Sequence, residues 1–373
     1  MNKINEPVSF SSFISLVLHE IFNNLSNIYS TENYDSDRFG KISLRKKIKN
    51  SVLRTFNKNN ICMFKASNLK TFTDKIEWIE KVSYLYVLLE DEYSKKLLVK
   101  LVVFRLLGNT RVKLPTNTKE FWDTRKMSKE LICSKETLDS GFKNWRLNYF
   151  DLNKIGRNIK LYARGVNSIF MLKQYEYHNT SASVKAEKGD EVIDAGGCWG
   201  DTALYFAEIV GEKGAVHSFE FCESNLNVFY KNLELNPVLS PRIRIVKNAL
   251  YNISGELMNY KETGPGTHFE INNKKAIKQV ETITVDDYVE KNKINRIDFI
   301  KMDIEGAELY ALQGAERSIK RYLPKLAISL YHKPEDFYLI PEYLHSLELG
   351  YHFYLGHYTI HKEETVLFAK SFE

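Results

Sequence analysis

The polar side chains that could bind a small molecule or take part in chemistry gather in two short runs of the sequence. In the first run, Asp194 ends an apolar stretch of strand character, and a glycine-rich turn leads from it into a helical pattern. Glycine permits positive φ angles and lets a ligand approach the backbone closely. A dinucleotide fingerprint needs glycines in the order G-x-G-x-x-G. Counted from Gly196, however, the positions of its second and third glycines are occupied by Cys198 and Asp201. The run therefore predicts a nucleotide site and disfavours a nicotinamide cofactor.

The acids in this part of the chain favour a positively charged ligand. The Asp194 carboxylate would repel a pyrophosphate, whereas it suits a ligand with an amino group and a sulfonium, such as S-adenosylmethionine. Glu220 ends the next predicted strand and could accept hydrogen bonds from two ribose hydroxyls; the alternative is a solvated acid. Asn248, which could also be a turn residue, and Ala249 would flank the adenine. The predicted cofactor contacts are Asp194, Gly196, Gly197, Gly200, Thr202, Glu220, Asn248 and Ala249. Either Thr202 or Asp201 is expected to cap the helix that follows.

The second run follows a largely apolar strand over 297–302 and delivers three charged side chains toward its carboxyl end: Lys301, Asp303 and Glu305. On an extended chain Asp303 and Glu305 have the same parity, so both are expected to point to one side. They could hold a divalent metal such as Mg²⁺, or one of them could be a general base. The alternative is that Glu305 and Glu308 only cap the next helix.

His332 closes the following strand and is expected to face the same crevice. A neutral imidazole can take a proton from a hydroxyl, because its unperturbed pKa is about 6.5. The neighbouring Lys333 could hold a substrate phosphate, and the alternative for His332 is a structural histidine. Methyltransferases that act on amino groups often carry a D/N-P-P-Y/F motif after the strand that here ends at Met302. In this chain that place reads Asp303-Ile304-Glu305-Gly306, so the motif is absent. We therefore expect a hydroxyl acceptor. The expected catalytic residues are Asp303 first, His332 second, and then Glu305 and Lys301.

The elements that must position these residues alternate between strand and helix after residue 180. Such alternation is typical of a parallel sheet that is covered on both faces. The expected strands are 192–193, 215–221, 242–250, 296–302, 325–331, 351–355 and 365–370. The expected helices between them are 201–210, 224–235, 307–322 and 334–347. Because a short loop precedes the last strand, that strand could be antiparallel to its neighbour.

The chain before residue 180 has mainly helical periodicity, with expected helices at 12–27, 76–89 and 92–107. We therefore expect three parts. Residues 1–146 form a helical domain that serves as a substrate lid or a dimer surface. Residues 147–180 form a connector with a few strands. Residues 181–373 form the cofactor-binding domain.

Composition narrows the class of protein. The 373 residues are 43% hydrophobic and carry a net charge of +6, which is ordinary for a globular chain and too mild to argue for nucleic acid alone. Four scattered cysteines indicate free thiols in a reducing cytosol. No apolar run reaches the roughly 20 residues that span a bilayer, so we expect a soluble cytoplasmic protein. The basic stretch Lys41 to Lys58 could lie on a membrane or a nucleic acid, but it reads more simply as a solvated helix face.

Over residues 180–370 the sequence resembles the FkbM-type methyltransferase family. The resemblance rests on residues 192–196 with Gly200, on Phe219-Glu220, on 285–288, on 300–308 and on 332–336, and the Lys-x-Asp-x-Glu-Gly-x-Glu run is its specific part. Where the family often has proline after the strand-two glutamate, this chain has Phe221.

The resemblance implies a Rossmann-like class I methyltransferase with a seven-stranded, mostly parallel sheet and an antiparallel last strand. It also implies S-adenosylmethionine-dependent O-methylation, often of sugars or polyketides. Bacterial members with such an N-terminal extension often modify nucleotide-activated or surface-polysaccharide sugars. We therefore expect a sugar or nucleotide-sugar acceptor for capsule or surface polysaccharide, no nucleic-acid partner, and a chain that could form a homodimer. A ribose methyltransferase of nucleic acid, or an enzyme of a non-sugar natural product, is the alternative.

Overall fold

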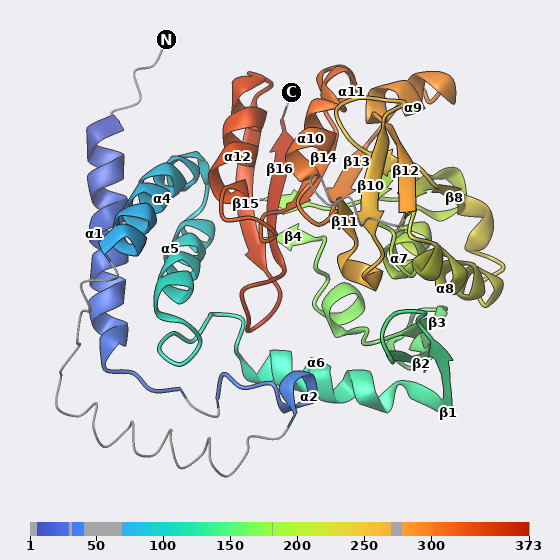
Figure 1. Cartoon of the computed structure of the whole chain (residues 1–373), viewed down its shortest axis with the longest axis horizontal. Coiled ribbons are helices and arrows are strands. Elements are labelled where there is room, and N and C mark those ends of the chain that lie inside the picture. Colours follow the sequence, from blue (N-terminus) through green and yellow to red (C-terminus); the bar gives the residue numbers. More distant parts are fainter. Residues whose placement is uncertain (1–5, 30–31, 41–68, 181, 270–277, 373) are drawn as a thin grey trace.

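The computed structural model describes residues 6–29, 32–40, 69–180, 182–269 and 278–372, and a seven-stranded sheet lies at its centre (Figure 1). The strand order is β8-β7-β6-β13-β14-β16-β15. All neighbours are parallel except that β16 is antiparallel to both β14 and β15. The strands are β6 (Glu191–Ala195), β7 (Ala215–Phe219), β8 (Ile243–Val246), β13 (Phe299–Met302), β14 (Lys325–Ser329), β15 (Tyr351–His357) and β16 (Thr365–Ser371). The predicted Rossmann-like sheet and its antiparallel last strand are confirmed.

Helices cover both faces of this sheet, as the apolar character of its strands requires. Neighbouring residues of one strand face opposite layers: Val192 packs in the cluster that contains α7 and α8, and Ile193 in the cluster that contains α9 to α12. These helices are α7 (Asp201–Val210), α8 (Glu223–Glu234), α9 (Val285–Lys291), α10 (Glu308–Gln313), α11 (Glu316–Tyr322) and α12 (Asp336–Ser346).

Two predicted elements are divided in the structure. The helix expected at 307–322 is interrupted at Gly314, and becomes α10 and α11. The strand expected at 242–250 is also divided, because its end leaves the large sheet as β9 (Ala249–Leu250). That strand joins a four-stranded sheet, β11-β10-β12-β9, which the sequence analysis did not foresee. Its other strands are β10 (Leu257–Lys261), β11 (His268–Phe269) and β12 (Lys278–Ile283), with the turn η6 (Gly264–Gly266) between β10 and β11.

The predicted N-terminal helices are present as α1 (Glu6–Leu25), α4 (Leu69–Leu88) and α5 (Glu92–Leu107). They lie beside the β15 edge of the sheet and beside α12 (Figure 1). Phe13 and Leu98 are fully buried in the same apolar cluster as Ile300 of the central strand. Leu89 forms a parallel bridge with Phe353, so the chain between α4 and α5 continues the edge of the sheet.

The segment 1–146, expected to be mainly helical, also contains a strand. β1 (Ile132–Asp139) pairs with β2 (Arg146–Asp151), and β2 pairs with β3 (Lys160–Ala163), so one small sheet spans the expected boundary at 146/147. The remaining elements are α2 (Ser36–Phe39), α6 (Lys119–Glu130), β4 (Tyr177–His178), β5 (Ser183–Val184), η2 (Leu152–Ile155), η3 (Asn167–Met171), η4 (Gly211–Lys213) and η5 (Ser240–Arg242).

The stretch Lys41 to Lys58 falls outside the described residues. Within the described ranges, no helix combines the length and the apolar character that crossing a membrane requires.

Candidate functional site

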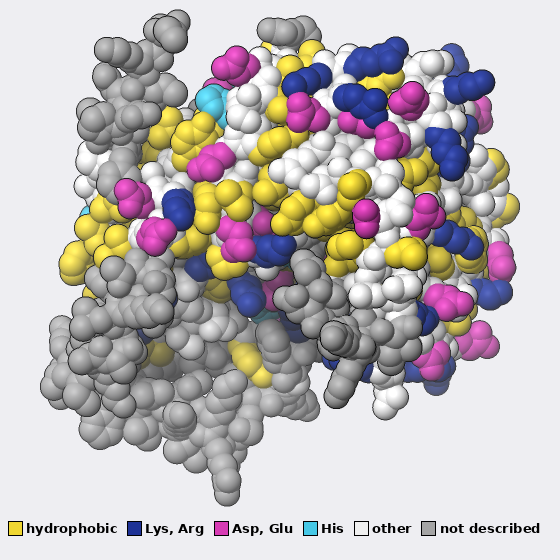
Figure 2. Space-filling view, turned by 45° about the horizontal axis from the view of Figure 1, so that its top comes forward, with side chains coloured by type: hydrophobic (Ala, Val, Ile, Leu, Met, Phe, Trp, Pro, Cys, Tyr) yellow, Lys and Arg dark blue, Asp and Glu magenta, His cyan; other side chains and the backbone are white. Residues whose placement is uncertain are grey.

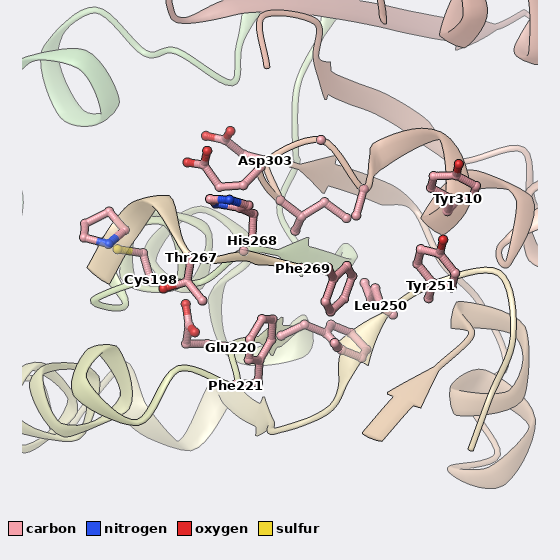
Figure 3. Close-up of a pocket in the computed structure, with 18 of the residues that line it drawn as sticks. Cys198, Glu220, Phe221, Leu250, Tyr251, Thr267, His268, Phe269, Asp303 and Tyr310 are labelled. Atoms are coloured by element: carbon pink, nitrogen blue, oxygen red, sulfur yellow. The ribbon is translucent and has the colours of Figure 1, made fainter. Parts of the chain in front are cut away.

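A cavity opens at the carboxyl ends of the central strands, where ligands of open α/β sheets bind. Its walls are the segments that follow β6, β7, β8, β13 and β14, and its roof is formed by residues 265–269. Glu220 and Asp303 lie on opposite walls, with His268 between them in the view of Figure 3. Of the described residues, those that line this cavity all lie between Gly196 and Lys333. Among the described residues, η6 and β11 cover the cavity, and none before residue 147 lines it.

The glycine-rich turn after β6 packs closely against the end of β13, and this is possible because its glycines have no side chains. Gly196 has φ +87°, and a Cβ there would lie 2.0 Å from the carbonyl oxygen of Asp303. A Cβ on Gly197 would lie 2.1 Å from Ser218 Oγ. Gly200 is the N-cap of α7 and has no side chain to cap it, but Asp201 Oδ1 accepts the Thr202 backbone N–H in the first turn at 3.1 Å. The Thr202 hydroxyl donates to the Asp194 carboxylate at 3.0 Å, so of the two expected residues Asp201 serves the start of the helix.

Asp194 and Lys301 were expected to contact cofactor and substrate, but they are not among the described residues that line the cavity. They are register partners on the adjacent strands β6 and β13. Lys301 Nζ lies 3.0 Å from Asp194 Oδ1, and both side chains are almost completely buried. Burial opposes the charge on Lys301, yet Asp194 and Asp303 raise its pKa. Its Nζ also donates to the carbonyl oxygens of Ala195, at 3.0 Å, and Gly196, at 2.7 Å. The ion pair thus holds the glycine-rich turn in place from within the sheet.

Glu220 lines the cavity as predicted. Its carboxylate accepts hydrogen bonds from the backbone N–H of Cys222 at 2.6 Å and from the Asn225 amide at 3.3 Å. Burial raises the pKa of Glu220 to about 7, although these hydrogen bonds oppose the shift. Asn248 and Ala249 also line the cavity, and Asn248 donates to the carbonyl oxygen of Glu281 at 3.2 Å.

Four aromatic rings surround one end of the cavity (Figure 3). Tyr251 stacks on Tyr310 with ring centroids 4.7 Å apart, and meets the edge of Phe269 at 5.7 Å. Phe221 lies nearly parallel to Phe269. Of these rings only Phe221 could be identified from the sequence, because the other three are brought to the cavity by β9, by α10 and by the four-stranded sheet, which was not predicted. The one local sequence signal was the Gly264-Pro265-Gly266 turn.

Asp303 lies at the wall of the cavity with its carboxylate held by two phenols. Tyr331 donates to one oxygen at 2.8 Å and Tyr175 to the other at 2.9 Å. Burial would raise the pKa of Asp303, but His332, Lys301 and these hydroxyls hold it below its usual value. Neither tyrosine was identified from the sequence.

Glu305 lines the same wall from a left-handed backbone conformation, with φ +55°. Burial raises its pKa to about 7, and the neighbouring Asp303 carboxylate acts in the same direction.

His332 lies behind this wall, among three carboxylates. Its Nδ1 lies 2.9 Å from Glu308 Oε1, and its Nε2 lies 3.3 Å from Asp303 Oδ1 and 3.6 Å from Glu305 Oε2. Burial opposes its positive charge, but these acids raise its pKa to about 10. These acids therefore favour the charged form of the ring, whereas the expected role as a base needs the neutral form.

Two further residues complete this wall. Glu308 is fully buried and accepts the backbone N–H of Ile304 at 2.8 Å, so it holds the turn before α10 much as the capping alternative predicted. Lys333 lines the cavity, where its ammonium donates to the carbonyl oxygen of Gly306 and lies 5.9 Å from the centre of the Tyr310 ring.

A mostly parallel sheet with this strand order, an antiparallel last strand and a cavity at its carboxyl edge defines the Rossmann-like class I methyltransferases. Residues 183–353 match the family model of the methyltransferase FkbM domain, so this part of the chain is a methyltransferase domain of the FkbM family. The expected family is thereby confirmed, and with it S-adenosylmethionine as the cofactor.

The chain is similar to several solved structures, of which the first named below supports the fold. A methyltransferase FkbM from Methylobacillus flagellatus KT has a TM-score of 0.52 and 19% identity, over 88% of this chain and 71% of that chain. A putative rRNA-methylase from Clostridium thermocellum has a TM-score of 0.34 and 13% identity, over 50% and 90%. An S-adenosylmethionine-dependent methyltransferase from Aquifex aeolicus has a TM-score of 0.30 and 18% identity, over 49% and 82%. No curated protein sequence matches the chain.

Proposed function

We propose that this chain transfers a methyl group from S-adenosylmethionine to a hydroxyl oxygen of a sugar. One observation carries the proposal: Glu220 on one wall of the cavity faces Asp303 on the other, and Glu305 lines the same cavity. The first wall suits the cofactor's ribose, and the second suits an acceptor hydroxyl. The absence of a D/N-P-P-Y/F run after β13 supports oxygen over nitrogen as the acceptor.

The cavity residues fit the cofactor. Glu220 would accept hydrogen bonds from the ribose hydroxyls, and the aromatic end formed by Phe221, Tyr251, Phe269 and Tyr310 would hold the adenine. The turn at Gly196 presents backbone without a side chain, where a ligand can approach. When bound, S-adenosylmethionine supplies a methyl group on a positively charged sulfur, and the acceptor oxygen takes that group as the carbon–sulfur bond breaks.

Glu305 is the group that we propose to take the hydroxyl proton. Its carboxylate lines the cavity, and no hydrogen bond to it is formed by a side chain of the described residues. Asp303, the first choice from the sequence, has both of its oxygens engaged by tyrosine hydroxyls. General bases contribute about 10²–10⁴-fold to a rate.

A second cavity favours an acceptor with an anionic carrier, such as a nucleotide-activated sugar for surface or capsule polysaccharide. It is lined by Trp78 and Pro334, by four basic side chains (Arg38, Lys75, Arg105 and Lys362) and by one acid, Glu363, which forms an ion pair with Arg38. Lys333 of the cofactor cavity directly precedes Pro334, so the two cavities flank one short segment. Such an acceptor fits a cytoplasmic enzyme.

Methylation of a nucleic-acid ribose is the alternative. On the face drawn in Figure 2, lysines and arginines are interspersed with aspartates and glutamates. A nucleic-acid partner would favour a continuous basic surface, so this distribution favours a small acceptor.

Calorimetry tests the cofactor proposal. We expect S-adenosylmethionine and S-adenosylhomocysteine to bind the full chain and NAD not to bind. Glu220→Ala should weaken both by about 1.5–3 kcal/mol for each lost charged hydrogen bond, whereas Glu223→Ala, at the exposed start of α8, should not. Equal affinity of the two variants would contradict the assigned role of Glu220.

Methyl transfer to nucleotide sugars tests the reaction. Glu305→Gln should lower kcat by about 10²–10⁴-fold and leave the affinity for S-adenosylmethionine nearly unchanged. A Glu305→Gln variant with the wild-type kcat would exclude Glu305 as the base. Transfer to RNA with a steep salt dependence, and none to sugars, would favour the alternative.

A further inference from the structure

We propose that Asp303, Glu308 and His332 bind a divalent transition-metal ion beside the cavity. Each residue offers one donor atom, and these atoms all lie within 4.8 Å of one another. This inference goes beyond methyl transfer, because the ion could bind whatever the acceptor is. It also differs from the Mg²⁺ site on Asp303 and Glu305 that the sequence suggested, since the structure adds Glu308 and His332.

The surroundings of His332 are mainly acidic. Three carboxylates, those of Asp303, Glu305 and Glu308, lie within 3.6 Å of its ring nitrogens. Glu308 is fully buried, and His332 is only 6% exposed. The two nearby lysines have other partners: Lys301 pairs with Asp194, and Lys333 donates to a backbone carbonyl. The ring thus lies in a largely buried group of carboxylate oxygens, and a divalent cation is the kind of ligand that such oxygens and an imidazole nitrogen bind together.

The polar atoms of this group are close to one another but poorly aligned. Neither ring nitrogen of His332 makes a hydrogen bond of acceptable geometry, although carboxylate oxygens lie at 2.9 and 3.3 Å. Glu308 Oε2 is buried and has no hydrogen-bond partner among the described residues. Buried polar atoms of native proteins rarely lack partners. Two atoms that ligate one ion at about 2.1 Å lie about 3 Å apart without sharing a proton. An ion takes only one ring nitrogen, and the 3.3 Å between His332 Nε2 and Asp303 Oδ1 is close to that separation, while one donor atom from each of the three residues lies within 4.8 Å of the others.

The donor set indicates the kind of ion. Two carboxylate oxygens and one imidazole nitrogen suit Mn²⁺, Fe²⁺, Co²⁺ or Zn²⁺ better than Mg²⁺ or Ca²⁺, which prefer oxygen alone. Because Asp303 also lines the cavity, an ion held there would border the place of the acceptor hydroxyl and could lower its pKa. That catalytic role rests on the proposed function, whereas the binding itself does not.

Titration of the metal-stripped full chain with MnCl₂, followed by the EPR signal of free Mn²⁺, tests the site. We expect one Mn²⁺ per chain, displaced by Zn²⁺. Glu308→Gln and His332→Gln should each weaken Mn²⁺ binding by roughly tenfold or more. Glu316→Gln is the matched control, because this acid lies on α11 with Lys320 and Tyr343 as its partners. Circular dichroism checks that each variant is folded, and Asp303→Asn replaces any variant that is not.

A folded wild-type chain that binds no Mn²⁺ at millimolar concentration would overturn the proposal. So would folded Glu308→Gln and His332→Gln variants that bind Mn²⁺ as tightly as Glu316→Gln does. Since Mn²⁺ binding is measured without turnover, a failure to methylate sugars would count against the proposed function and not against this site.

Discussion

Lys301 is a buried cation that forms an ion pair with Asp194 on the neighbouring strand. Its Nζ lies 3.0 Å from Asp194 and also holds the carbonyl oxygens of the glycine-rich turn. Removing one partner of such a pair leaves a buried charge without compensation. Lys301→Met should therefore lower the free energy of unfolding by about 3–5 kcal/mol, measured by urea denaturation. Lys320→Met removes an exposed pair with Glu316 and should cost at most about 1 kcal/mol.

The pair also predicts a partial rescue. In Asp194→Asn/Lys301→Met neither charge remains, so the double variant should be more stable than Lys301→Met alone. A Lys301→Met variant as stable as Lys320→Met, or a double variant less stable than Lys301→Met, would contradict this account of the turn.

Glu220 should make cofactor binding depend on pH. Because its pKa is about 7, the Glu220 carboxyl of the cofactor-free protein carries a proton below that pH, and the ribose hydroxyls would displace this proton. Affinity for S-adenosylmethionine should rise as pH increases from 6 to 8, with about one proton released per cofactor bound at the acidic end. The nearby thiols of Cys198 and Cys222 have raised pKa values, so they stay neutral over this range.

Calorimetry in buffers of different ionisation enthalpy measures that proton, and Glu220→Gln should abolish both its release and the pH dependence. Without cofactor the sign is opposite. The folded chain keeps the proton up to about pH 7, whereas an unfolded glutamate loses it near 4.5. The Glu220 contribution to the free energy of unfolding therefore falls as pH rises between these values. Proton release that persists in Glu220→Gln would assign it to another group.

Among the elements, the turn between β6 and α7 makes the sharpest structural demand. Gly196 and Gly189 both have positive φ, but a Cβ at Gly196 would meet the Asp303 carbonyl at 2.0 Å, whereas one at Gly189 meets nothing within 4 Å. Gly189→Ala should cost about 1–2 kcal/mol for its left-handed backbone. Gly196→Ala should cost clearly more and also weaken S-adenosylmethionine binding, because the turn must move away from β13. Thermal melts and calorimetry compare the two variants, and equal losses would contradict the close packing.

Some helices could be predicted from local sequence pattern alone, and others could not. α5 and α7 have the predicted bounds, because both are rich in apolar residues and each ends at a glycine, Gly108 and Gly211. The helix predicted at 307–322 is divided because Gly314 packs against the backbone of Tyr251, where a Cβ would lie 2.2 Å from its carbonyl oxygen. That contact joins residues more than 60 positions apart and leaves no local signal.

At the scale of the whole molecule, the N-terminal helices and the sheet share one apolar core. Leu98 of α5 is fully buried in the same cluster as Ile300 and Phe353. Leu98→Ala should therefore lower the free energy of unfolding by about 2–5 kcal/mol in a single transition that fluorescence and circular dichroism report together. Leu257→Ala, which alters a leucine that is 63% exposed, should change it by about 0.5 kcal/mol or less. Separate melting of the N-terminal helices would contradict the shared core.

The sequence alone determined the positions along the chain of the seven strands of the large sheet, the glycine-rich turn, and the acids at the strand ends. These features follow from periodicity and turn chemistry, which act over a few neighbouring residues. It placed Glu220, Asn248, Ala249, Asp303 and Glu305 correctly at one edge of the sheet, because parallel strands end on the same side.

Only the tertiary structure decided which side chains meet. The register of β6 and β13 turned Asp194 and Lys301 into a buried pair. The packing of distant segments brought Tyr175 and Tyr331 to Asp303 and placed His332 beside Glu308. Such contacts depend on strand order and on side-chain packing between residues far apart in the chain. No local sequence pattern specifies which of these residues come together.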